Sequence, residues 1–169
     1  APESQPRADR RHGIRFMTPA SVARSDTPPY LMTMDYDILI LGAGAAGMMA
    51  AVAAGETAEH AGRPARIGVL EKNARPGIKV LVCGGGRCNF TNSGSVDALI
   101  AQFGRNGRFL TPALHHLDNQ ALMDWFAARG VPSHEEPGGK IYPNSNQARR
   151  VVHALLRRMP ELNVEIHAG

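Results

Sequence analysis

The chain has 169 residues, enough for one domain of ordinary size, and 43% of them are hydrophobic, as is typical of a globular protein. No apolar run approaches the roughly 18 residues of a membrane span, and two cysteines are too few for a secreted disulfide scaffold. The net charge of +4 comes mostly from arginine, while aromatic residues, at 5%, offer little surface for stacking nucleic-acid bases. We therefore predict a cytoplasmic protein that binds neither nucleic acid nor a membrane.

Residues 1–34 differ in composition from the rest of the chain. They are rich in proline, arginine, serine and threonine and have no sustained apolar period, which is typical of a disordered segment or a non-native extension. Arginine and serine are also common in organelle transit peptides, but Glu3, Asp9 and Asp26 count against one. Because Met32 and Met34 stand just before the first predicted strand, we expect the folded protein to begin there.

The next part of the chain predicts a strand, a helix and a second strand. The apolar run Ile38–Leu41 is short and ends at Gly42, which is typical of a buried parallel strand. An alanine- and methionine-rich helix is expected from about Ala45 to Glu59. The sequence ARIGVLE then predicts a strand that ends at Glu71, so that the segment forms a βαβ unit.

Further elements follow a glycine-rich stretch. We expect short helices over 95–103 and 108–117, a helix over 118–130 capped by Asp118, an extended piece over 138–143, an amphipathic helix over 145–160 and a strand over 163–168. The chain ends soon after this last strand, whereas a doubly wound sheet usually has more strands. We therefore expect residues 35–169 to be the N-terminal part of a larger α/β domain.

The sequence GAGAAG places Gly42, Gly44 and Gly47 in G-x-G-x-x-G spacing, between a strand and a helix as a dinucleotide-binding loop requires. Gly42 permits a tight turn, Gly44 lets a pyrophosphate approach the main chain, and Gly47 lets the helix pack closely on the strand. Ala45, Ala46 and Gly47 begin the predicted helix, and the free backbone amides at this end of a helix can donate hydrogen bonds to a phosphate. The alternative is a glycine-rich turn without a ligand.

Glu71 stands at the end of the second predicted strand. A carboxylate there can accept hydrogen bonds from both ribose hydroxyls of an adenosine, and it would repel the 2′-phosphate of NADP. The glycine motif does not separate FAD from NAD. A second glycine-rich, basic loop follows soon after Glu71 and favours FAD, because an extended FAD molecule runs beyond the first crevice and needs further contacts.

The stretch KVLVCGGGRCNFTN has three interpretations. Cys83 and Cys88 have the C-x4-C spacing of flavin-dependent disulfide reductases, but each glycine between them disfavours the required helix by about 1 kcal/mol relative to alanine. Two cysteines do not complete a tetrahedral zinc site, so no metal is predicted. In the third interpretation Gly84–Gly86 lie against a ring or pyrophosphate and Arg87 supplies a permanent cation; the alternative for Arg87 is a surface salt bridge.

Three segments, residues 35–51, 70–92 and 122–156, together resemble the BaiN/RdsA-like family of NAD(P)/FAD-dependent oxidoreductases. Members are aminoacetone oxidase-like flavoproteins or 3-dehydro-bile-acid reductases, and the GGGRCN-x-TN block is the specific part of the resemblance. It implies a Rossmann-like FAD-binding domain, a three-layer α/β fold with a mostly parallel sheet. The domain would be incomplete here, with its remainder and the substrate domain missing.

The resemblance also implies a set of cofactor-binding residues. These are Gly42, Gly44, Ala45, Ala46 and Gly47 at the pyrophosphate, Glu71 at the adenosine ribose with Lys72 beside it, Gly85, Gly86, Arg87, Cys88 and Asn89 near the pyrophosphate and flavin, and Lys79 as an assisting basic residue. We predict an FAD-dependent oxidoreductase that transfers hydride between NAD(P)H, or an organic donor, and an unknown small substrate. The alternatives are an NAD-binding redox sensor without catalysis and a disulfide reductase using Cys83 and Cys88. No catalytic residue and no oligomeric state are predicted.

Overall fold

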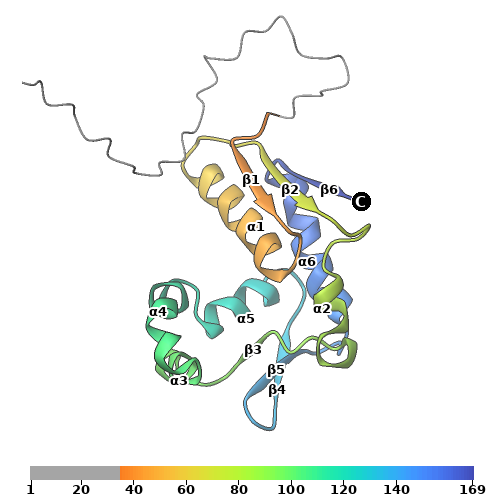
Figure 1. Cartoon of the computed structure of the whole chain (residues 1–169). Coiled ribbons are helices and arrows are strands. Elements are labelled where there is room, and N and C mark those ends of the chain that lie inside the picture. The colour runs from red at the N-terminus through yellow and green to blue at the C-terminus, as the bar shows by residue number, and fades with distance from the viewer. Residues whose placement is uncertain (1–34) are drawn as a thin grey trace, which may run out of the picture. The chain divides into compact units, whose positions relative to one another are not determined.

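The computed structural model describes residues 35–169, so the expectation for residues 1–34 lies outside the described part of the chain. Figure 1 shows the arrangement of its elements. In chain order these are β1 (Ile38–Leu41), α1 (Ala45–His60), β2 (Ile67–Glu71), α2 (Ile78–Val82), the 3-10 helix η2 (Cys83–Gly86), β3 (Thr91–Asn92), α3 (Val96–Gln102), the 3-10 helix η3 (Gly104–Asn106), α4 (Gly107–His116), α5 (Asn119–Ala127), β4 (Ser133–Glu136), β5 (Lys140–Pro143), α6 (Ala148–Glu161) and β6 (Val164–Ala168).

The first sheet is parallel and has the strand order β1-β2-β6. Ile38, Ile67 and Val164 are aligned across its three strands. Helix α1 connects β1 to β2, so the predicted βαβ unit is confirmed, and β6 pairs with the other edge of β2. The predicted fold class, an α/β fold with a parallel sheet of the Rossmann type, is confirmed by this arrangement.

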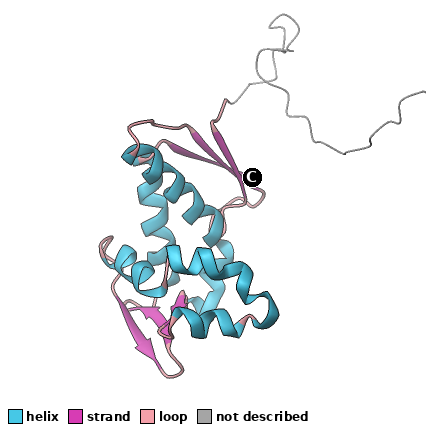
Figure 2. Cartoon of the chain, turned by 90° about the vertical axis from the view of Figure 1, so that its left-hand side faces the viewer, coloured by secondary structure: helices cyan, strands magenta, loops and turns pink. Residues whose placement is uncertain are grey.

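Helices α1 and α6 pack on one face of this sheet (Figure 2). The two helices approach closely where Gly55 of α1 meets Leu162, because a β-carbon on Gly55 would stand 2.6 Å from that of Leu162. Burial of each large apolar side chain in such a core contributes about 1.5–3 kcal/mol to stability. The buried residues shared by the sheet and the two helices are Met48, Ala51, Val52, Ile67, Val69, Val151, Val152, Leu155, Met159, Leu162 and Val164.

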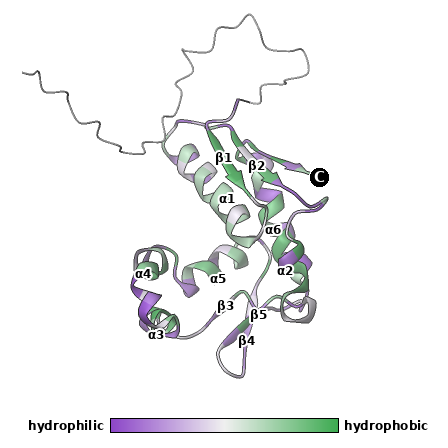
Figure 3. Cartoon of the chain, in the orientation of Figure 1, coloured by the Kyte–Doolittle hydropathy of each residue, from purple (hydrophilic) through white to green (hydrophobic). Residues whose placement is uncertain are grey.

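The opposite face of the parallel sheet is open in the described part of the chain. Leu39 and Leu41 of β1 are 53% and 79% exposed, and Leu70 of β2 is 37% exposed. Figure 3 shows that β1 is hydrophobic along its length. The ring of Tyr36 lies over Gly68 on this side, where a β-carbon would come within 2.7 Å of it. Of the three layers predicted, residues 35–169 therefore supply the sheet and one helical layer.

The remaining elements form a small antiparallel sheet, with strand order β3-β5-β4, and the helices α3, α4 and α5 (Figure 1). The carboxylate of Asp118 accepts a hydrogen bond of 2.7 Å from the amide of Ala121, so the predicted cap of α5 is confirmed. Phe126 of α5 is buried, with its ring centroid 5.2 Å from that of Phe90. Through this contact α5 packs against the segment that connects the glycine-rich loop to β3.

No helix in residues 35–169 has both the length and the apolar character needed to cross a membrane.

The amphipathic pattern of α6 leads to a stability prediction. Met159 is 1% exposed, and replacing it with alanine should lower the free energy of unfolding by about 2–5 kcal/mol, because the side chain leaves a cavity in the core. Arg150→Ala, at an exposed position of the same helix, should change it by less than about 0.5 kcal/mol. Urea denaturation measures both, and equal effects would contradict the placement of the α6 core face.

Candidate functional site

The turn between β1 and α1 is held by backbone contacts. Gly42 has a φ of +96°, in a region that favours glycine. A β-carbon on Gly47 would stand only 1.9 Å from the carbonyl oxygen of Gly42, so glycine alone permits α1 to approach β1 this closely. A β-carbon on Gly44 would meet nothing within 4 Å, which leaves the main chain there open to a ligand. The turn thus has the geometry predicted from its three glycines.

The first turn of α1 offers unpaired amides to this open space. Gly44 precedes the helix, and no side chain caps it. The first backbone N–H groups of an α-helix have no partner within the helix and carry a partial positive charge. Ala45, Ala46 and Gly47 therefore present donors that suit an anion.

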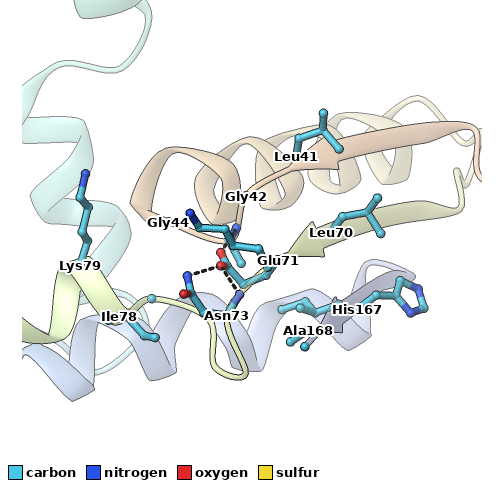
Figure 4. Close-up of a pocket in the computed structure, with 15 residues that line it drawn as sticks. Leu41, Gly42, Gly44, Leu70, Glu71, Asn73, Ile78, Lys79, His167 and Ala168 are labelled. Atoms are coloured by element: carbon cyan, nitrogen blue, oxygen red, sulfur yellow. Dashed lines mark hydrogen bonds between the residues drawn. The ribbon is translucent and has the colours of Figure 1, made fainter.

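Glu71 joins the end of β2 to this turn (Figure 4). Its carboxylate accepts a hydrogen bond of 2.8 Å from the amide of Ala43 and one of 2.9 Å from the amide of Asn73. These bonds, that from Asn73 foremost, hold the pKa of Glu71 below its ordinary value. An ionised carboxylate at this position retains further lone pairs that can accept hydrogen bonds from a ligand.

A cavity of about 1050 Å³ lies beyond the carboxyl ends of β1, β2 and β6. This is the position at which open parallel α/β sheets bind ligands. Its lining includes five of the predicted site residues: Gly42, Gly44, Glu71, Lys72 and, at the far side, Lys79 of α2 (Figure 4). The other lining residues are Leu41, Ala43, Leu70, Asn73, Gly77, Ile78, Ile166, His167, Ala168 and Gly169.

A second cavity, of about 680 Å³, shares Leu41, Gly44 and Lys79 with the first. The two cavities therefore meet at the turn before α1. Predicted site residues in the second cavity are Gly44, Ala45, Ala46, Gly47, Lys79, Cys88 and Asn89. Its apolar wall is formed by Met49, Val80, Phe90, Leu117, Leu122, Phe126, Val151 and Leu155.

Asn89 lines the second cavity and has an unsatisfied polar atom. Its Oδ1 atom is buried and has no hydrogen-bond partner within residues 35–169. A buried acceptor without a partner is unfavourable by about 1–3 kcal/mol. A ligand that donates an N–H or O–H group at this point would remove that penalty.

The glycine-rich loop has an unusual backbone. Gly84, Gly85 and Gly86 have φ values of +57°, +66° and +85°, and Cys88 follows with +65°. Only glycine adopts such angles without a steric penalty, which explains the run of three. Gly85 has nothing within 4 Å of where a β-carbon would stand, so this part of the loop faces open space. Gly85 and Gly86 do not line either cavity, and their contact with a cofactor stays a prediction.

Arg87 points to the β4–β5 hairpin. Its Nη1 atom lies 2.6 Å from Oε1 of Glu136, and its guanidinium carbon lies 4.1 Å from the ring centroid of Tyr142. Arg87 lines neither cavity. Arg87 thus makes the salt bridge that was the alternative interpretation of this residue, and its contact with a cofactor stays a prediction.

The two cysteines differ in environment. Cys83 is exposed, Cys88 is buried, and both are free thiols. Burial raises the pKa of the Cys88 thiol to about 11, and the neighbouring Cys83 adds to the shift. Cys88 is therefore a neutral thiol at neutral pH, whereas thiol–disulfide exchange needs a thiolate. Within residues 35–169, no three His, Cys, Asp or Glu side chains are grouped so as to hold a metal ion.

Sequence reasoning did not identify Asn73 or the end of β6 as parts of the site. Asn73 donates to Glu71 from both its amide and its side chain. Its position two residues after Glu71 is the local signal for such a turn. His167 and Ala168 line the first cavity because β6 is parallel to β2 and the two strands end together. The strand over 163–168 was predicted, but its neighbour in the sheet was not.

The comparison with protein families accounts for this geometry. A family model described as HI0933-like protein Rossmann domain matches residues 36–169.

The chain belongs to the HI0933-like family.

This is the family whose resemblance the sequence indicates, so that prediction is confirmed. The chain is 33% identical over 129 residues to the ribosomal RNA dihydrouridine synthase of Escherichia coli (strain K12), which covers 76% of this chain and 30% of that protein. It is also 33% identical over 130 residues to the 3-dehydro-bile acid delta(4,6)-reductase of Clostridium scindens, covering 77% of this chain and 30% of that protein. The chain thus spans about 30% of the length of these two relatives.

Among solved structures, the HI0933-like chain matches the crystal structure of Thermovibrio ammonificans THI4. The TM-score is 0.49 and the identity 12%, over 80% of this chain and 38% of that one.

The close approach of α1 to β1 predicts the effect of a single methyl group. Gly47→Ala should lower the free energy of unfolding by at least about 1–3 kcal/mol, because the new β-carbon overlaps the carbonyl oxygen of Gly42. This loss should occur although alanine is the better helix former by about 1 kcal/mol. Gly44→Ala, whose β-carbon would meet no atom of residues 35–169 within 4 Å, is the control. Urea denaturation that finds Gly47→Ala as stable as the wild type would contradict the packing.

The two thiols should react with iodoacetamide at different rates in the native protein. At pH 8 a thiol with a pKa of about 11 is ionised in only about 1 molecule in 1000, and Cys88 is also buried. Mass spectrometry should therefore find Cys83 modified long before Cys88, and equal rates only after unfolding. Equal labelling of the folded protein would contradict the environment described for Cys88.

Proposed function

We propose that this Rossmann domain binds FAD and belongs to a flavin-dependent oxidoreductase. The observation that carries the proposal is the junction of the two cavities at Gly44 and Lys79. A nucleotide ligand at Glu71 can continue past the start of α1 into the second cavity. FAD has the required extended form, with an adenosine at one end, a flavin at the other and a pyrophosphate between them.

The first cavity suits the adenosine half of FAD. The carboxylate of Glu71 would accept hydrogen bonds from the ribose hydroxyls, and Lys72 stands beside it on the lining. The pyrophosphate would lie at Gly44, where no β-carbon intervenes, and receive hydrogen bonds from the amides of Ala45–Gly47. The Lys79 side chain, at the junction, would supply a cation to the same phosphates.

The second cavity suits the flavin half. Its wall is mostly apolar, which suits a planar ring system, and the unpaired Oδ1 of Asn89, a lining residue, would accept a hydrogen bond from an N–H or O–H group of the flavin. The neutral thiol of Cys88 would be a small neighbour of the ring. Bound FAD supplies hydride transfer, and these residues position and shield it.

The reaction class rests on the two relatives. Their names denote the formation of dihydrouridine and the reduction of a delta(4,6) bile acid, and both products arise by reduction of a carbon–carbon double bond. We propose a reaction of the same class, with NAD(P)H or an organic compound as the hydride donor. The substrate is proposed to be a small molecule. Because the chain spans about 30% of these relatives, the rest of the FAD domain and the substrate domain are proposed to lie in further chain.

The purified full-length protein tests the cofactor directly. We expect absorption bands near 370 and 450 nm and release of FAD on denaturation. Absence of these bands together with failure to bind added FAD would contradict the proposal. Retained binding of NAD alone would instead favour the redox-sensing alternative.

Gly44→Ala tests the position of the pyrophosphate. The added methyl group meets no atom of residues 35–169 within 4 Å but occupies the space through which phosphate would approach, so the affinity for FAD should fall by about 10- to 100-fold with little change in thermal stability. Ala50→Ser, at an exposed position of α1 that lines neither cavity, is the control and should bind FAD as the wild type does. Fluorescence titration with FAD measures both, and equal affinities would exclude the pyrophosphate from this turn.

A further inference from the structure

We propose that Arg87 is a positioning residue and that Glu136 and Tyr142 are its partners in this role. The three residues form a clamp that fixes the glycine-rich loop so that Cys88 and Asn89 face the second cavity. This inference rests on the proposed function, because it assigns a role in holding the flavin end of the site.

The clamp holds the guanidinium group of Arg87 by two kinds of contact. Glu136 accepts a hydrogen bond of 2.6 Å from Nη1, and the ring of Tyr142 lies 4.1 Å from the guanidinium carbon. His134 braces the same group: its ring is stacked on Tyr142 at an interplanar angle of 30°, and its Nε2 lies 3.4 Å from the Glu136 carboxylate. Glu136, Tyr142 and the bracing His134 all come from β4 and β5, so the clamp joins the loop to the hairpin.

The hydrogen bonds that the loop makes within itself are all short-range. Cys83–Gly86 form a 3-10 turn, the amide of Arg87 donates to Gly84 at 3.3 Å, and the amide of Cys88 donates to Cys83 at 3.0 Å. The three glycines have no intrinsic preference for the left-handed angles they adopt here, because glycine populates positive and negative φ about equally. An external restraint is therefore needed to select this conformation.

The hairpin supplies that restraint on both sides of Cys88 and Asn89. Before them, Arg87 is clamped, and Gly84 lies so close to Tyr142 that a β-carbon would come within 3.2 Å of the ring. After them, the amide of Phe90 donates a hydrogen bond of 3.1 Å to the carbonyl of Ile141 in β5. The buried thiol and the unpaired amide oxygen thus stand between two fixed points.

The positive charge of Arg87 is already paired with the carboxylate of Glu136. The guanidinium lines neither cavity, and its hydrogen bond to Glu136 is the foremost reason that the pKa of this carboxyl lies below its ordinary value. Contact with a phosphate would bring a second anion to a guanidinium that already donates to Glu136. If Arg87 bound the cofactor directly, removing Glu136 would leave the affinity for FAD unchanged or raise it. If Arg87 fixes the loop, removing Glu136 should lower that affinity.

A double-mutant cycle in the full-length protein separates these two roles. Arg87→Met and Glu136→Gln should each weaken FAD binding by about tenfold, and the double variant should bind no more weakly than either single variant. The visible spectrum of the bound flavin should change in the same way in both variants as in Asn89→Leu. Arg66→Met and Glu165→Gln, which break an ion pair of similar exposure away from both cavities, are the controls and should leave affinity and spectrum unchanged.

The inference is overturned if Glu136→Gln leaves FAD affinity unchanged or raises it while Arg87→Met lowers it, since that result makes Arg87 a direct ligand. It is also overturned if both variants lose affinity by independent, additive amounts or retain the wild-type flavin spectrum. A wild-type protein that binds no FAD contradicts the proposed function itself. Circular dichroism of each variant confirms that it is folded, so that lost affinity is assigned to the loop.

Discussion

The candidate site depends on the close approach of α1 to the end of β1. The carbonyl of Gly42 occupies the space that a side chain at Gly47 would need, and only glycine allows it. This approach places the start of α1 beside β2, where both backbone groups of Ala43 are held: its amide by Glu71, at 2.8 Å, and its carbonyl by the amide of Gly77, also at 2.8 Å. The same turn therefore orients the helix amides, fixes Glu71 and sets the start of α2.

The glycine-rich loop between α2 and β3 is stabilised by different contacts from the turn between β1 and α1. The first turn is constrained by its own close packing, whereas the loop between α2 and β3 takes left-handed angles at glycines, which adopt positive and negative φ about equally. Its conformation depends on contacts with the β4–β5 hairpin, which lies some 50 residues further along the chain. One half of the site is thus determined by local steric constraints, and the other half by tertiary contacts.

This difference explains what could be predicted from the sequence. The β1–α1–β2 unit, the caps and the core face of α6 follow from apolar periodicity and glycine spacing, which are local signals. The strands β3 and β4 were not predicted, because TN and SHEE show no apolar alternation and form only by pairing with β5. The helix α2, with sequence IKVLV, was taken as part of the loop. Pro160, expected to end α6, lies within it, one residue before its last, Glu161. The partners of Arg87 and the unpaired oxygen of Asn89 are properties of the folded chain that no spacing reveals.

The most direct test of this account is a crystal structure of the full-length protein with FAD. We expect the pyrophosphate within hydrogen-bond distance of the amides of Ala45–Gly47, the ribose hydroxyls on Glu71 and the flavin beside Asn89, with Arg87 still on Glu136. A cofactor whose phosphates lie away from the start of α1, or whose flavin lies outside the second cavity, would contradict it.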